Sequence, residues 1–231
     1  MTKPGELTRE YAWGNRKRFL TPIKLFLLCN LIYFVAAAQF PIGVLTVPLR
    51  VQTGQMMYQG VARAMVDEHL HMEAPAMTLE ERAARDSVKT VFATKYDGAT
   101  LGIGKVIVAA LIPLCAIAFQ ILYVGRRRFF AEHLILSTHM TAFLLVAIAG
   151  LGVIAAGAQR LAGAWSLNNE LLFSTFFSVA FVSYSYVAQR VAYGTGRMGA
   201  ALRTGLFAMA MVPILTVLKF ILFVVTLHWV S

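Results

Sequence analysis

Five apolar runs limit what this chain can fold into more than any other feature of its sequence. They cover residues 25–47, 103–124, 134–158, 171–189 and 206–229. A helix that crosses the hydrocarbon core of a bilayer needs about 20 apolar residues. The whole chain is 58% hydrophobic and 14% charged, whereas soluble domains carry about 25% charged residues. We therefore expect an all-α polytopic membrane protein, a bundle of five transmembrane helices.

The basic residues predict how this bundle is oriented. Twelve Lys and Arg residues fall in three short segments, 1–24, 125–133 and 190–205. The segment 159–170 has only Arg160, and the long segment 48–102 has six basic against seven acidic residues. Basic residues favour the cytoplasmic side of short loops. We expect a bacterial inner-membrane protein with a cytoplasmic N-terminus and an extracytoplasmic C-terminus. The net charge of +10 is then explained by topology, without a nucleic-acid partner.

The first segment, 1–24, mixes aromatic and basic residues before the first apolar run. Aromatic rings prefer the headgroup level of a bilayer, and basic side chains prefer anionic lipids. The segment is therefore predicted to lie at the cytoplasmic interface. The expected lipid-headgroup contacts are Arg16, Lys17, Arg18, Arg126, Arg127 and Arg128.

The segment 48–102 is predicted to form a helical hairpin outside the membrane. Residues 51–72 favour one helix, which would end before Pro75. Thr78 and Glu81 have the spacing of a capping box, which marks the start of a second helix. Gly98 offers a stop for that helix.

Polar residues recur near the cytoplasmic end of the apolar runs. Glu132 and His139 are seven positions apart, so they share one face of a helix, whereas His133 points about a hundred degrees away. An unpaired polar group is costly in lipid. We therefore expect an inner-leaflet polar cluster, composed of Asn30, Gln120, Glu132, His139 and Tyr184. Such a cluster fits a proton relay, a headgroup or quinone site, or interhelical hydrogen bonds that hold the bundle together.

Lys219 is the one charged residue placed near mid-bilayer. It lies thirteen residues into the last apolar run, and Gln39 has a similar depth in the first run. An ionisable residue at this depth marks a functional site by default. The alternative is a tilted helix that holds the ammonium group in a small polar pocket.

No metal or cofactor is expected from the sequence. Cys29 and Cys115 both lie in apolar runs, so neither a disulfide nor a zinc ribbon is indicated. His139 and His228 lie at opposite ends of the bundle, so haem ligation by two histidines is not favoured. The segment "DEHLHMEA" around His69 and His71 is only a weak metal motif. No nucleotide-binding loop or hydrolase motif is present.

Three segments resemble the bacterial membrane-protein family known as domain of unknown function 3667. They are "REYAWGNRKRFLTPIKLF", "FFAEHLILSTHMTAFLL" and "QRVAYGTGRMGAALRTGL". The matching positions include Tyr11, Gly14, Glu132, His133, Leu134, His139, Arg190, Tyr193 and Gly194. The resemblance implies a shared fold and a role for the Glu-His helix, but it supplies no activity. Many members begin with a cysteine-rich ribbon, whereas this chain has no cysteine before Cys29.

Three functions are compatible with these features. The first is a non-catalytic accessory or scaffold subunit of a larger membrane complex, which the odd number of spans, the small residues Gly150 and Gly157, and the lack of a catalytic motif favour. The second is a small proton-coupled transporter that uses Lys219 and the Glu132–His139 pair. The third is a lipid-modifying enzyme in which that pair acts as a general base. A transporter needs a hydrated path across about 12 Å of depth between Lys219 and His139.

Overall fold

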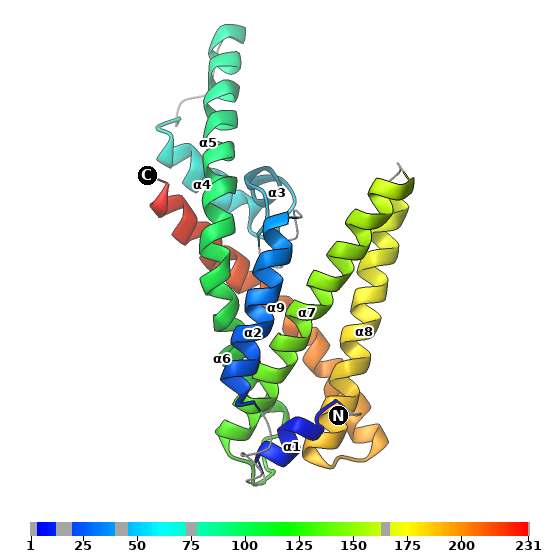
Figure 1. Cartoon of the computed structure of the whole chain (residues 1–231). Coiled ribbons are helices and arrows are strands. Elements are labelled where there is room, and N and C mark those ends of the chain that lie inside the picture. Colours follow the sequence, from blue (N-terminus) through cyan, green and yellow to red (C-terminus); the bar gives the residue numbers. More distant parts are fainter. Residues whose placement is uncertain (1–3, 13–19, 40–45, 73–77, 163–166, 231) are drawn as a thin grey trace. The chain divides into compact units, whose positions relative to one another are not determined.

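The structure, a computed structural model, describes residues 4–12, 20–39, 46–72, 78–162 and 167–230. These residues are all-α and form nine α-helices with one 3₁₀ turn (Figure 1). In chain order the elements are α1 (Glu6–Ala12), α2 (Pro22–Gln39), α3 (Leu49–Gly54), α4 (Gln59–His69), α5 (Leu79–Ile107), η2 (Val108–Ala110), α6 (Leu111–Leu122), α7 (Phe130–Ala162), α8 (Leu167–Tyr193) and α9 (Arg197–Trp229).

The chain divides into two compact units. Unit 1 contains Met1–Ile42 and Leu111–Ile214, and unit 2 contains Gly43–Ala110 and Leu215–Ser231. Helix α9 therefore contributes its first half to unit 1 and its second half to unit 2, and the division falls beside Pro213. Proline inside a helix removes a backbone hydrogen bond and clashes with the preceding turn, so it is a natural point of division.

Two helices in the described residues are long and apolar enough to cross a membrane, namely Phe130–Ile154 of α7 and α9. If the bent pair of α5 and η2–α6 counts as one span, there are three. The five predicted spans are thus shown only in part. Helix α2 is apolar over just Pro22–Ala37, and residues 40–45 lie outside the described chain. Polar residues such as Ser183, Ser185 and Gln189 lower the hydropathy of α8.

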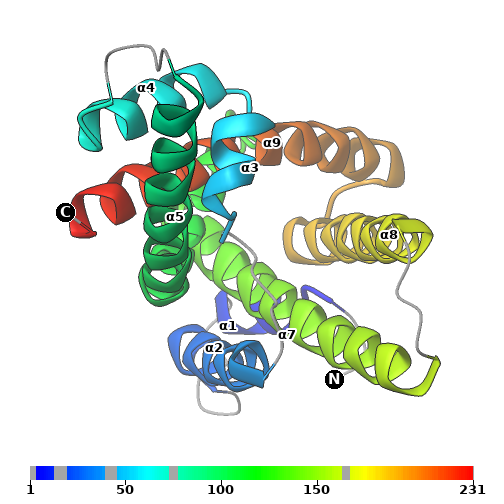
Figure 2. The ribbon, with the colours of Figure 1, turned by 90° about the horizontal axis from the view of Figure 1, so that it is seen from above.

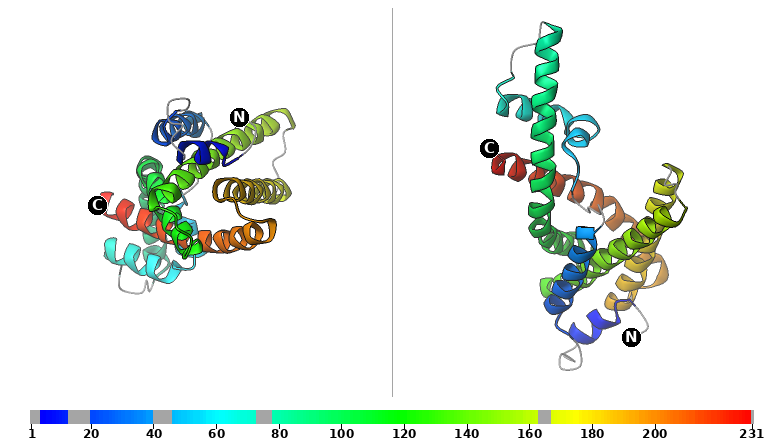
Figure 3. Two further views of the ribbon diagram at one scale, coloured as in Figure 1. Left: turned by 90° about the horizontal axis from the view of Figure 1, so that it is seen from below. Right: turned by 45° about the horizontal axis from the view of Figure 1, so that its top comes forward.

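Unit 1 is built around α7. Helices α2 and α6 pack along it, α8 also contacts it, and α1 lies against both α7 and α8 (Figures 1, 2 and 3). Helix α2 buries Phe26, Cys29 and Tyr33, which recur at helical spacing and so lie on one face. Its other faces expose six large aliphatic side chains: Ile23, Leu27, Leu28, Leu31, Ile32 and Val35. A helix that is apolar all round fits a membrane better than water.

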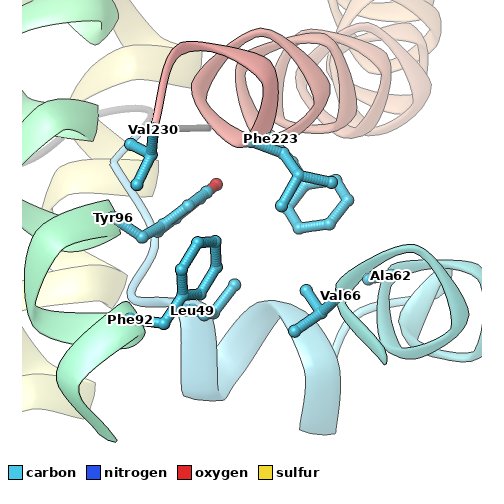
Figure 4. Close-up of a cluster of buried hydrophobic side chains, with 8 residues drawn as sticks. Leu49, Ala62, Val66, Phe92, Tyr96, Phe223 and Val230 are labelled. Atoms are coloured by element: carbon cyan, nitrogen blue, oxygen red, sulfur yellow. The ribbon is translucent and has the colours of Figure 1, made fainter. Parts of the chain in front are cut away.

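Unit 2 has a small aromatic core of its own. Figure 4 shows Phe92 and Tyr96 of α5 beside Phe223 of α9, with Ala62 and Val66 of α4 below. Leu49 of α3, Leu227 and Val230 complete this cluster. Gln52 lies fully buried near it, where its amide donates to the hydroxyl of Tyr96 at 3.3 Å. The hydroxyl of Tyr58 donates in turn to the Gln52 carbonyl oxygen at 2.5 Å.

The helices of segment 48–102 differ from the prediction in two places. The capping box is confirmed, because the Thr78 hydroxyl accepts from the Glu81 backbone N–H and the Glu81 carboxylate accepts from the Thr78 N–H. The stop at Gly98 is wrong, since α5 continues to Ile107. A glycine costs a helix only about 1 kcal/mol, so a single glycine does not by itself end one. The single helix predicted for 51–72 is instead two, α3 and α4.

Candidate functional site

Glu132, in the first turn of α7, accepts hydrogen bonds from two residues just before the helix. Its carboxylate accepts from the side chain of Arg128 at 2.8 Å and from the backbone N–H of Phe129 at 3.4 Å. A carboxylate in the first turn caps free N–H groups and interacts favourably with the helix dipole. Glu132 therefore has a clear structural role at the start of α7.

At the next residue, a hydrogen bond joins α7 to the end of α8. His133 is fully buried, and its Nδ1 lies 2.6 Å from the hydroxyl oxygen of Tyr193. Gly194, which follows, has a φ of +61° and ends α8 in the left-handed conformation that glycine adopts easily.

The same region carries a second chain of hydrogen bonds. The hydroxyl of Tyr123 donates to the Gln189 carbonyl oxygen at 3.1 Å, and the Gln189 amide donates to the Thr204 hydroxyl at 3.2 Å. The rings of Tyr123 and Tyr193 are 4.0 Å apart between centroids. We call these five residues (Tyr123, His133, Gln189, Tyr193 and Thr204) the Tyr193 cluster. It connects the end of α6 to α7, α8 and α9.

Arg203 covers one side of the Tyr193 cluster. Its guanidinium lies 4.9 Å from the centroid of the Tyr123 ring, within range of a cation–π interaction. It also donates to the backbone carbonyls of Leu122 and Gly199, both at 3.2 Å. The guanidinium of Arg203 is therefore held by hydrogen bonds to backbone carbonyls near the end of α6 and the start of α9.

His139 lies two turns further along α7 and is 5% exposed. Its Nδ1 is 2.7 Å from the Thr8 hydroxyl of α1, whereas its Nε2 is buried without a hydrogen-bond partner in the described part of the chain. His139 lines a pocket of about 290 Å³, to which α1 contributes Thr8, α2 Leu25 and Cys29, α7 Phe143, and α8 Tyr184. We call it the His139 pocket.

Gly5 explains how α1 comes so close to α8. It has a φ of +84°, and a Cβ added at this position would lie 2.5 Å from the carbonyl oxygen of Ala188. Both the backbone conformation and the space therefore require glycine. This contact positions Thr8, three residues later, against His139.

The structure brings some of the predicted polar residues together. His139 and Tyr184 line one pocket, whereas Glu132 is paired with Arg128. Asn30 on α2 is partly buried, with an Oδ1 that has no partner among the described residues. Gln120 on α6 is half-buried.

The remaining predicted residues are not among the lining of this pocket, or they lie outside the described residues. Lys219 belongs to unit 2 and is half-buried. The side chain of Gln39 lies outside the described residues, as do Arg16, Lys17 and Arg18. Arg126 and Arg127 are exposed in the turn that precedes α7. Among the residues with described side chains, no three His, Cys, Asp or Glu groups are close enough to hold a metal ion.

The sequence reasoning missed the Tyr193 cluster and the Thr8–His139 contact. His133 was set aside because it faces away from His139, and that is the face that meets α8. The resemblance carried a usable signal, since its second and third segments contain His133 and Tyr193, which are hydrogen-bonded here. Thr8 carried no such signal, because a threonine in a polar segment is ordinary.

Comparison with known proteins supports the resemblance at the N-terminus. The family model "Protein of unknown function (DUF3667)" matches residues 1–34. This range contains Pro4, Gly5, Leu7, Thr8, Leu25 and Cys29, which form one side of the His139 pocket. The resemblance of the other two segments stays a prediction. No curated protein sequence and no solved structure matches the chain.

Proposed function

We propose that the chain is a five-span protein of the bacterial inner membrane and serves as a non-catalytic accessory or scaffold subunit of a larger complex. In addition to α7, α9 and the bent pair, α2 and α8 would complete the five spans. At 1.5 Å per residue, the 27 residues of α8 extend about 40 Å, which is enough to cross the hydrocarbon core. The distribution of basic residues supports a cytoplasmic N-terminus.

The observation that carries the accessory role is the set of hydrogen bonds within the Tyr193 cluster of unit 1. His133 with Tyr193, Tyr123 with Gln189, and Gln189 with Thr204 connect four helix ends. Hydrogen bonds of this kind stabilise contacts between membrane helices. They leave these side chains engaged in the fold, where a catalytic site would need a group free to meet a substrate.

The outer surface of unit 1 also suits a subunit that packs against others. Helix α2 exposes six large aliphatic side chains, as described above. On α7, a Cβ added at Gly150 or Gly157 would meet no atom within 4 Å in the described chain. Small residues let another helix approach closely, so this face of α7 leaves room for one.

The topology is tested with single cysteines in a chain that carries Cys29→Ala and Cys115→Ala. We expect Glu80→Cys to react with a membrane-impermeant maleimide in intact spheroplasts, and Arg127→Cys to react only after permeabilisation. Both positions are exposed, so a lack of reaction reports the membrane barrier rather than burial. The reverse pattern would overturn the proposed orientation.

The accessory role is tested by extracting the tagged protein directly into nanodiscs and weighing the particles by native mass spectrometry. We expect the chain of 25.4 kDa to be accompanied by other polypeptides in a fixed ratio. A matched control is an unrelated tagged five-span protein expressed at the same level. Particles that contain only one copy, or whole multiples of 25.4 kDa, would rule out the role.

A further inference from the structure

The His139 pocket has the size and position of a small ligand site in unit 1. Its volume of about 290 Å³ is close to the lower limit of about 300 Å³ for ligand pockets. It is partly open and lies where α1, α2, α7 and α8 meet. Because α2 and α7 are the most apolar elements around it, a ligand that dissolves in the membrane has the most direct access.

The described part of the lining does not favour charged ligands. It contains no Asp, Glu, Lys or Arg, and its apolar residues include Leu7, Leu25, Ala142, Phe143 and Val146. An ionised headgroup or a phosphate would lose its hydration here without gaining a counter-charge. A neutral, largely apolar molecule loses much less on entering.

Four polar residues nevertheless line the pocket beside this apolar surface: Thr8, Cys29, His139 and Tyr184. The Nε2 of His139 is buried without a partner in the described chain. Leaving a buried polar group unpaired is unfavourable. Nε2 is covered in this structure, so a ligand oxygen bonds to it once the His139 ring turns toward the pocket, and the lining favours a molecule with hydrogen-bonding oxygens.

The hydrogen bond with Thr8 lets His139 bind either a carbonyl oxygen or a hydroxyl group. When the Thr8 hydroxyl donates to Nδ1, the proton sits on Nε2, which can donate to a carbonyl. When Nδ1 donates to Thr8, Nε2 accepts and can receive a hydroxyl proton. A molecule that exists both as a diketone and as a diol therefore fits in both forms.

An aromatic pair completes the lining. The rings of Phe143 and Tyr184 stack with centroids 3.8 Å apart and planes within 5° of parallel. A flat ring packs well against such a pair, because offset stacking adds a favourable term to the burial of apolar area. A flexible acyl chain gains no such stacking interaction.

We propose that the His139 pocket binds the head of a membrane-dissolved quinone. The oxygen of the head bonds to His139 and Tyr184, and its ring packs near Phe143. This inference concerns binding alone and goes beyond the accessory role, because it depends only on residues of unit 1. A partner complex is not needed for it to hold.

The test uses the full chain in nanodiscs made from quinone-free phospholipid. A ubiquinone with a single isoprenyl unit is added, and binding is measured by equilibrium dialysis with the partition into empty nanodiscs subtracted. We expect saturable binding of about one quinone per chain. Farnesol, which has an isoprenoid tail but no ring, should compete poorly. Absence of saturable binding, or equal competition by farnesol, overturns the proposal.

Variants locate the binding. His139→Phe and Tyr184→Phe should each weaken the affinity by about threefold to tenfold, as expected for one lost hydrogen bond. Ser137→Ala is the matched control, because Ser137 is also buried on α7 without a partner among the described residues but is not in the pocket lining. It should change the affinity less than twofold. If His139→Phe does not fold, Tyr184→Phe decides alone, and unchanged affinity in that variant places the quinone elsewhere.

Discussion

His133 on α7 and Tyr193 on α8, sixty residues apart, meet through a hydrogen bond of 2.6 Å between Nδ1 and the phenol oxygen. Both side chains are at least 97% buried. The contact links the first turn of α7 to the last turn of α8. Its energetic importance follows from burial, because neither group can turn to water when the other is removed.

Tyr193→Phe should therefore destabilise the protein by about 1–3 kcal/mol, since it leaves Nδ1 of His133 unpaired in addition to Nε2, which has no partner in the described chain. The loss is measured as a fall in unfolding free energy during titration with a denaturing detergent. Tyr186→Phe on the same helix is the control and should have little effect. Adding His133→Leu to Tyr193→Phe should restore part of the loss, because it removes the unpaired group. Strictly additive losses would show that the two side chains do not interact.

Gln189 should couple energetically to Thr204. Gln189→Leu breaks two hydrogen bonds, to Tyr123 and to Thr204, whereas Thr204→Val breaks only one. In a double-mutant cycle we expect a coupling energy of about 0.5–1.5 kcal/mol between positions 189 and 204. Pairing Gln189→Leu with Ser137→Ala gives a control cycle that should show no coupling. A value near zero for the first cycle would contradict the described contact.

Gly5→Ala should displace α1 from α8. The new Cβ would lie 2.5 Å from the Ala188 carbonyl oxygen, and the φ of +84° is unfavourable for alanine. We expect faster amide hydrogen exchange in residues 6–12 and weaker quinone binding. Gly150→Ala is the control, because its Cβ would meet no atom within 4 Å. Unchanged exchange in Gly5→Ala would mean that α1 does not depend on this contact.

Unit 2 should lose stability at alkaline pH in part through Tyr58. Burial raises the pKa of Tyr58 above its usual 10, so the folded state favours the protonated phenol. The contribution is complete below pH 10 and is lost as the pH rises through the folded-state pKa. We expect the melting temperature to fall less steeply above pH 10 in Tyr58→Phe than in the wild type. Tyr186→Phe should keep the wild-type decline, and equal slopes in all three proteins would exclude Tyr58 as a source.

Features that depend on neighbouring residues could be predicted directly from the sequence. Thr78 and Glu81 cap α5 as their spacing predicts, because both partners lie within one turn. The apolar runs predicted helices, and the described residues contain helices without strands. The end of α5 could not be predicted, because whether a helix stops at a glycine such as Gly98 depends on its tertiary contacts.

The sequence by itself determined that this chain is helical and apolar, and that its basic residues gather in a few short segments. These features depend only on composition and on the spacing of nearby residues. Only the tertiary structure decided which polar groups meet. His133 finds Tyr193, and His139 finds Thr8 rather than Glu132. The reason is that a face shared along one helix says nothing about which neighbouring helix covers it. That choice depends on long-range contacts such as the close approach of Gly5 to Ala188, which no local pattern encodes.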